Sequence, residues 1–109
     1  MSDNLNQLEV LTLSAVMMLR DDAYGMTVHM QVEELAKGVR AVSLGSVYTT
    51  LDRLELKGYL KSWFSDPTPE RGGRSKRYFE VTGTGEKAVR AALSLSGKML
   101  DGLRGLEGM

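Results

Sequence analysis

The sequence predicts a mainly α-helical fold with one small β-hairpin, which is an α+β protein. Its length is that of a single domain. Two observations support this fold class. Apolar residues recur at helical spacing over most of the 109 residues, and the main strand-like stretch, residues 59–81, is interrupted by a loop that contains both prolines. There is no cysteine, which excludes disulfides and thiolate metal sites.

The first helix is expected over residues 5–19, where Leu8 and Leu11 begin an apolar stripe. Further apolar side chains fill much of the remaining helix surface. A helix that is apolar nearly all round needs neighbours on more than one side, so we expect a second subunit to cover part of it. The polar residues 20–22 should end this helix in a turn.

A second helix is expected to open at Tyr24 and Gly25 and to end before Gly38, which follows a lysine as a C-terminal cap should. The alternating residues 39–42 suggest a very short strand. The side chains expected to pack inward from this helix are Met26, Met30, Val32, Leu35 and Ala36.

The third helix is predicted over residues 44–57, with Ser43 as its N-cap and Gly58 at its end. Apolar residues spaced three and four apart define its buried edge, namely Leu44, Val47, Leu51 and Leu54. Tyr48 borders that edge. The polar residues expected away from it are Ser46, Thr49, Thr50, Arg53 and Lys57.

A hairpin should follow, with strands over residues 59–65 and 76–81 and a loop over residues 66–74. Because strand side chains alternate, Lys76 and Tyr78 should share one face of the second strand. Arg77 and Phe79 should lie on the opposite face.

The last helix is expected over residues 83–109, beginning at the cap Thr82. Its apolar residues follow a nearly heptad spacing, which favours packing against a partner, although four glycines predict fraying towards the end. The residues expected at a dimer interface are Leu8, Leu11, Val89, Leu93, Ser96, Met99, Leu100 and Leu103. We therefore divide the chain into residues 1–82 and a dimerisation helix, 83–109.

Charge is unevenly distributed although the formal net charge is zero. Residues 1–38 carry six acidic and two basic side chains, whereas residues 53–78 carry seven basic and three acidic ones. A chain without net charge can still present one basic face. The basic segment includes the loop of the hairpin.

Helices two and three form a helix-turn-helix, and the hairpin forms a basic wing beside it, an arrangement that favours DNA binding. Hydroxyl groups on the third helix can contact phosphates or base edges, and basic side chains can contact the backbone. The residues predicted to bind DNA are Ser43, Ser46, Tyr48, Thr49, Thr50, Arg53, Lys57, Arg71, Gly73, Arg74 and Lys76. On the wing we favour Arg74 and Lys76 over Arg77, because the strand's two faces cannot both meet DNA.

Several segments closely resemble the PadR-like transcriptional regulators, in order and over nearly the whole chain. They are Tyr24-Gly25 and residues 44–55 (LGSVYTTLDRLE), 73–79 (GRSKRYF) and 81–85 (VTGTG). The resemblance implies a winged helix-turn-helix and a homodimer built by the first and last helices. It also implies a palindromic promoter site, usually repression, and in some members release by a small lipophilic or phenolic effector. Drug-binding relatives carry a tryptophan in the last helix, whereas this chain's one tryptophan, Trp63, lies in the wing.

Other functions are less well supported by the sequence. His29 is the single histidine and has no second nitrogen or sulfur ligand near it in the sequence, so we predict no metal site, no cofactor and no catalytic set. The longest apolar run is too short to span a bilayer, and no signal-peptide pattern is evident, so a cytoplasmic protein is expected. The alternative that stays open is a winged-helix module that binds another protein without binding DNA.

Overall fold

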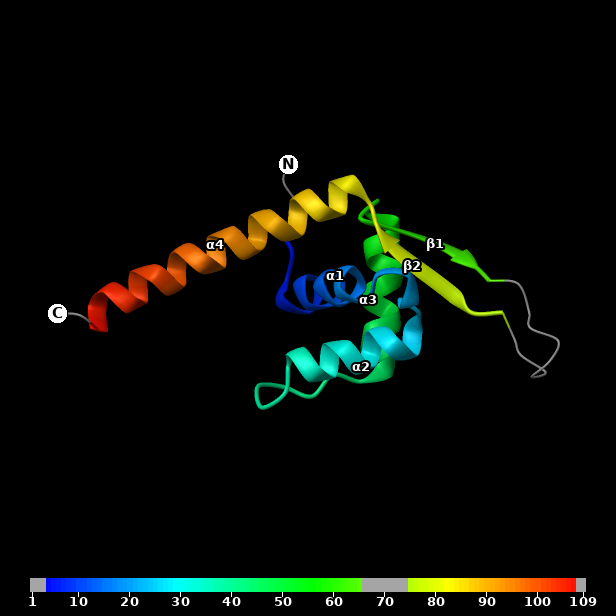
Figure 1. Cartoon of the computed structure of the whole chain (residues 1–109), viewed down its shortest axis with the longest axis horizontal. Coiled ribbons are helices and arrows are strands. Elements are labelled where there is room, and N and C mark those ends of the chain that lie inside the picture. The colour runs from blue at the N-terminus through cyan, green and yellow to red at the C-terminus, as the bar shows by residue number, and fades with distance from the viewer. Residues whose placement is uncertain (1–3, 66–74, 108–109) are drawn as a thin grey trace.

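The computed structural model describes residues 4–65 and 75–107, and it has the predicted α+β architecture with a two-stranded antiparallel sheet. Helices α1 to α3 form a cluster from which the hairpin extends in one direction and α4 in another (Figure 1). The elements in chain order are α1 (Gln7–Leu19), the 3-10 helix η1 (Arg20–Asp22), α2 (Gly25–Leu35), α3 (Leu44–Leu56), β1 (Leu60–Phe64), β2 (Arg77–Val81) and α4 (Gly83–Glu107).

Local capping explains where the helices begin and end. The side chain of Asn6 accepts a hydrogen bond from Glu9 N (2.8 Å), and Glu9 Oε1 accepts one from Asn6 N (2.9 Å), so α1 starts two residues later than predicted. Gly38 and Gly58 follow α2 and α3 with positive φ angles of 82° and 81°, which glycine adopts without strain. The short strand predicted at residues 39–42 does not form.

The core lies between α1, α2, α3, the hairpin and the first turns of α4. It does not include Met26, Met30 or Leu35, and the prediction that these pack inward is wrong: Met30 is 65% exposed. The inward side of α2 instead carries Val28, Val32 and the following Ala36. The buried apolar residues are Leu13, Ala15, Val16, Ala23, Val28, Val32, Ala36, Val42, Val47, Leu51, Leu54, Leu60, Phe79 and Val89.

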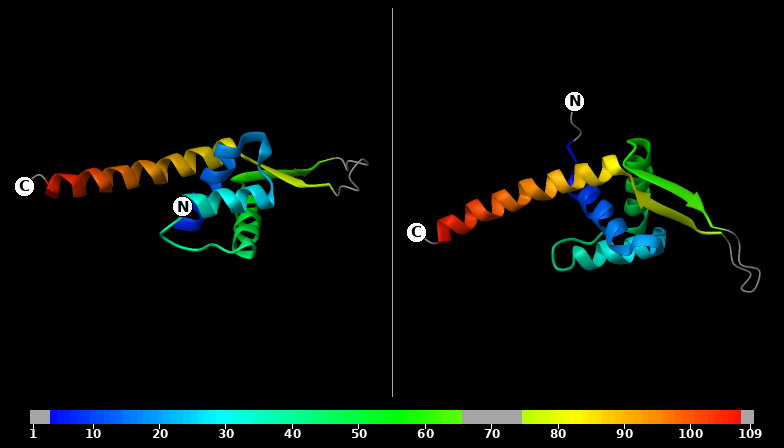
Figure 2. Two further views of the ribbon diagram at one scale, coloured as in Figure 1. Left: turned by 60° about the horizontal axis from the view of Figure 1, so that its bottom comes forward. Right: turned by 45° about the horizontal axis from the view of Figure 1, so that its top comes forward.

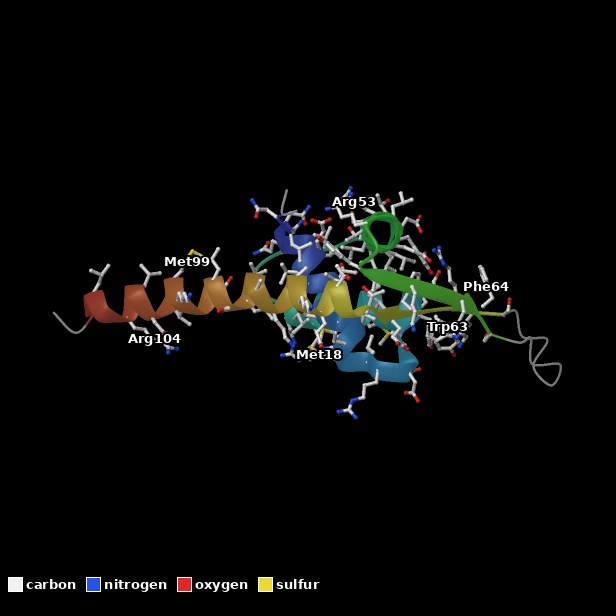
Figure 3. The ribbon with its side chains drawn as sticks, turned by 90° about the horizontal axis from the view of Figure 1, so that it is seen from above. Met18, Arg53, Trp63, Phe64, Met99 and Arg104 are labelled. Atoms are coloured by element: carbon white, nitrogen blue, oxygen red, sulfur yellow. The ribbon has the colours of Figure 1, made fainter. Side chains whose placement is uncertain are left out.

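The hairpin pairs Leu60 with Val81 at its base and Phe64 with Arg77 at its outer end. Phe79 is buried, and its N–H donates to Ala23 O (2.9 Å), which fastens β2 to the turn before α2. Alternation along β1 sends Trp63 and Phe64 to opposite sides (Figure 3).

Helix α4 begins as predicted, because Gly85 N donates to Thr82 Oγ1 (3.1 Å). It then continues unbroken through Gly97, Gly102 and Gly105 to Glu107, so the expected fraying is not observed. From Leu93 onwards nearly every described side chain is exposed. Figure 2 shows this part of α4 extending well past the other helices.

Candidate nucleic-acid interface

The start of α3 presents two hydroxyl groups to solvent. Ser43 Oγ accepts from Ser46 N (3.1 Å), which confirms Ser43 as the N-cap, and it donates to Ser46 Oγ (2.9 Å). Both serines are exposed. With its oxygen accepting from Ser43, the Ser46 hydroxyl can donate its own hydrogen to a phosphate or a base edge.

Thr49 and Arg53 continue this exposed side of α3, one helical turn apart. They border a surface hollow of about 470 Å³ that also includes Leu8 of α1. Arg53 points outward from α3 (Figure 3). Ser46, Thr49 and Arg53, called the recognition row below, combine hydroxyl donors with one cation.

Thr50 does not belong to that row, which corrects its prediction as a DNA contact. It is 2% exposed, and its hydroxyl donates to Ser46 O within the helix (2.7 Å). Position 50 faces the core because it lies one turn from Val47 and Leu54 on the buried side of α3. The neighbouring threonine is therefore the exposed one.

Lys57 also departs from its predicted role as a contact to the DNA backbone. Its Nζ lies 2.7 Å from Oε2 of Glu9, a carboxylate that is only 2% exposed. Burial alone would raise the pKa of Glu9, but hydrogen bonds from Lys57 and from Asn6 N, with the charges of Lys57 and Arg53, hold it below its usual value. The pair joins α1 to the end of α3, and no sequence pattern pointed to a buried acid at Glu9.

Tyr48 is 43% exposed and lies across the first residue of α2. Gly25 is buried there, and a Cβ on it would overlap the Tyr48 phenol ring. The glycine at the start of α2 therefore makes room for a side chain of α3. This contact brings the Tyr24-Gly25 pair and Tyr48, far apart in the sequence, into one place.

On the hairpin, Lys76 and Tyr78 share a face, as predicted. Lys76 Nζ lies 4.2 Å from the centre of the Tyr24 ring, and Tyr24 meets Tyr78 edge to face with ring centres 5.5 Å apart. Tyr78 in turn stacks on Trp63. Lys76 is exposed at the outer end of this aromatic row, where a basic side chain of a wing is expected.

Arg77 points the other way, towards α3, where it pairs with Asp52 and Glu55. The preference for Lys76 over Arg77 as a wing contact is consistent with this geometry. The remaining predicted wing residues, Arg71, Gly73 and Arg74, lie outside the described residues.

The residues predicted for dimerisation fall into two groups. Val89 is 1% exposed and packs in the core of its own chain, and Leu8 and Leu11 are half-buried against that core. The others are exposed on α4, where Met99 and Arg104 project to opposite sides (Figure 3). These exposed predicted residues are Leu93, Ser96, Met99, Leu100 and Leu103.

The described residues also bear on two other properties, metal binding and membrane spanning. Residues 4–65 and 75–107 contain no cluster of three or more side chains suited to hold a metal ion. Within the same residues, no helix has the length and apolar character needed to cross a membrane. His29 donates from Nε2 to Val42 O (2.7 Å), and the same nitrogen lies 3.1 Å from Glu33 Oε1.

A helix-turn-helix with an exposed polar row on its second helix, flanked by a hairpin with a basic side chain, defines a winged helix of the DNA-binding class. Residues 15–91 match the model of the transcriptional regulator PadR-like family. The chain belongs to the PadR-like family of transcriptional regulators. No curated protein matches the sequence.

Solved structures share the fold. A PadR family transcription regulator from Clostridium difficile R20291 superimposes with a TM-score of 0.76 at 22% identity, over 93% of this chain and 98% of that one. A PadR-like transcriptional regulator from Bacillus cereus gives 0.72 at 19% identity, over 91% and 89%. The Aeropyrum pernix ORC1 protein, solved in complex with DNA, gives 0.67 at 27% identity, over 83% of this chain and 24% of that one.

Proposed function

We propose that the protein represses transcription by binding, as a homodimer, a palindromic promoter site through α3 and the wing. The observation that carries this proposal is the recognition row, Ser46, Thr49 and Arg53, exposed on α3 beside a hairpin that carries Lys76. Donors on a helix can read the major groove while a basic hairpin contacts its flank. ORC1, which shares this fold over 24% of its own chain, was solved in complex with DNA, which supports DNA as the partner.

The dimer rests on the exposed half of α4. Leu93, Met99, Leu100 and Leu103 are about half exposed or more, on one side of a helix that meets no other described element there. An exposed apolar stripe of this length is typical of a protein interface. A two-fold dimer would present two α3 helices to half-sites about one DNA turn, roughly 34–36 Å, apart.

Footprinting on the DNA upstream of its own gene, at low and at higher salt, tests this function. We expect protection of an inverted repeat, two chains per site, and an affinity that falls steeply as salt rises because several phosphates are contacted. An intact dimer that binds no duplex at low salt would contradict the proposal. That result would favour the protein-binding alternative.

We also propose release of the DNA by a small lipophilic effector. A hollow of about 440 Å³ lies between the end of α1, the hairpin and the start of α4, and its apolar lining includes Val16, Met17, Trp63 and Val81. Because Trp63 is the chain's single tryptophan, its fluorescence would report binding there directly. A compound that lifts the footprint without changing that fluorescence would contradict this location.

A further inference from the structure

Arg77 lies at the outer end of the hairpin, paired in register with Phe64, the last β1 residue before the loop. Its guanidinium reaches across to α3. Nη1 lies 3.0 Å from Asp52 Oδ1, Nη2 contacts Glu55 Oε1, and Nε donates to Ser62 Oγ (3.1 Å). One side chain thus joins both strands of the hairpin to two successive turns of the helix.

The network is closed by Ser62, whose hydroxyl donates to Glu55 Oε2 (2.7 Å). Both carboxylate oxygens of Glu55 are therefore engaged. Arg77 and Glu55 are only about one-third exposed, at 34% and 32%, so the pair is screened less than a surface pair. A planar guanidinium with donors in a fixed fork suits this contact, which a lysine could make with a single point charge only.

The position of the network matters because α3 and the wing must meet DNA together. Lys76 and Arg77 are neighbours with different contacts: Lys76 faces the Tyr24 ring and solvent, and Arg77 faces α3. Asp52 and Glu55 lie on the side of α3 that faces the hairpin, away from the recognition row. Arg77 holds both carboxylates in ion pairs at the same time as it fixes the hairpin.

We propose that Arg77 is a positioning residue for DNA binding, which locks the angle between the wing and α3 through Glu55, Asp52 and Ser62. This inference rests on the proposed function. In this role Arg77 itself does not contact DNA.

Two substitutions separate this role from a phosphate contact. Arg77→Lys keeps the charge, so a phosphate contact would survive, whereas a positioning role predicts loss of the fork and about tenfold weaker binding. Glu55→Gln removes one negative charge from the protein, which simple electrostatics predicts to leave binding to a polyanion unchanged or to strengthen it. The positioning role predicts that it also weakens binding about tenfold.

The matched control is Glu80→Gln, which makes the same charge change near the base of the same hairpin, where Glu80 pairs with the exposed Lys61. We expect its affinity to stay within about twofold of the original protein. Affinities are measured on one duplex, selected by the unsubstituted dimer from a random-sequence library. Stoichiometric titration supplies the active fraction of each variant, so a loss of folded protein is not counted as weaker binding.

Repeating the selection with Arg77→Lys measures the base preference at each position, which a change in folding stability does not alter. We expect the bases under α3 to be retained and the preference at the flank under the wing to be lost. Full affinity for Arg77→Lys, or tighter binding by Glu55→Gln, would overturn the inference alone. If the unsubstituted dimer selects no duplex, the proposed function fails and the inference fails with it.

Discussion

At the scale of single residues, two adjacent threonines on α3 have opposite environments. Thr49 is exposed in the recognition row, whereas Thr50 is buried and bonds to Ser46 O. The two residues are identical, but Thr50 lies three residues after Val47 and four before Leu54 of the buried edge, a spacing that Thr49 does not share. Their separate roles can be measured with one substitution made at each position.

Thr50→Val should lower the free energy of unfolding by about 0.5–1.5 kcal/mol, because a buried hydroxyl loses its hydrogen bond, and should leave DNA affinity nearly unchanged. Thr49→Val should leave the stability unchanged and weaken operator binding. Denaturant titration and binding measured on both variants test this pair. Unchanged affinity in Thr49→Val would remove Thr49 from the interface.

Glu9 gives the protein an acid-sensitive contact. Its pKa in the folded state lies below the ordinary 4.5, so the Glu9–Lys57 pair stabilises the fold fully above about pH 4.5 and loses this effect as pH falls through the lowered value. Glu9→Gln should lower the free energy of unfolding at neutral pH by about 1–3 kcal/mol. It should also flatten the dependence of stability on acid pH.

Urea unfolding at a series of pH values measures both effects, with Glu80→Gln as the exposed control that should change little. Equal stability of Glu9→Gln and the original protein at neutral pH would show that the buried pair contributes nothing to the fold.

At the scale of elements, α2 and α3 can approach closely because one residue at their contact has no side chain. Gly25 at the start of α2 leaves space for the Tyr48 ring of α3. Neither residue's place in a helix is unusual, so the contact becomes visible only once the two helices are packed.

Gly25→Ala should displace the Tyr48 ring and weaken DNA binding, because the first turns of α3 carry the recognition row. Adding Tyr48→Ala to Gly25→Ala should relieve the overlap, so the stability of the double variant should recover relative to Gly25→Ala alone. Thermal unfolding of the single and double variants measures this coupling. Strictly additive changes would show that the two residues do not interact.

Element types and most boundaries were predictable, because the caps at Ser43 and Thr82 and the glycines after α2 and α3 act locally. The inward face of α2 was not predictable in this way. It carries two competing apolar rows with the same spacing, Met26 with Met30 and Val28 with Val32, and tertiary packing chose the valines. The Glu9–Lys57 and Arg77–Glu55 pairs were also hidden, since partners 48 and 22 residues apart leave no periodic signal.

At the scale of the whole molecule, α4 carries the proposed dimer interface away from α3 and the hairpin, which are the proposed DNA contacts (Figure 1). Leu103→Glu would place a charge in the apolar stripe, where Leu103 is 59% exposed in the single chain. It should shift the protein to monomers and weaken operator binding, since each chain then engages one half-site only. Sedimentation and footprinting measure the two effects.

Ser94→Glu is the matched control, because it adds the same charge about half a turn away from the stripe. It should leave the dimer intact. Leu103→Glu that remains dimeric, with α4 still helical, would place the interface elsewhere.

The glycines of α4 have a consequence for the amount of protein a cell must make. Each interior glycine weakens a helix by about 1 kcal/mol relative to alanine, and Gly97, Gly102 and Gly105 all lie where α4 meets no core of its own chain. Short isolated helices are marginal in water. In the proposed dimer a second chain would cover this half of α4, so we expect dilution to unwind the tail and to weaken DNA binding at the same time.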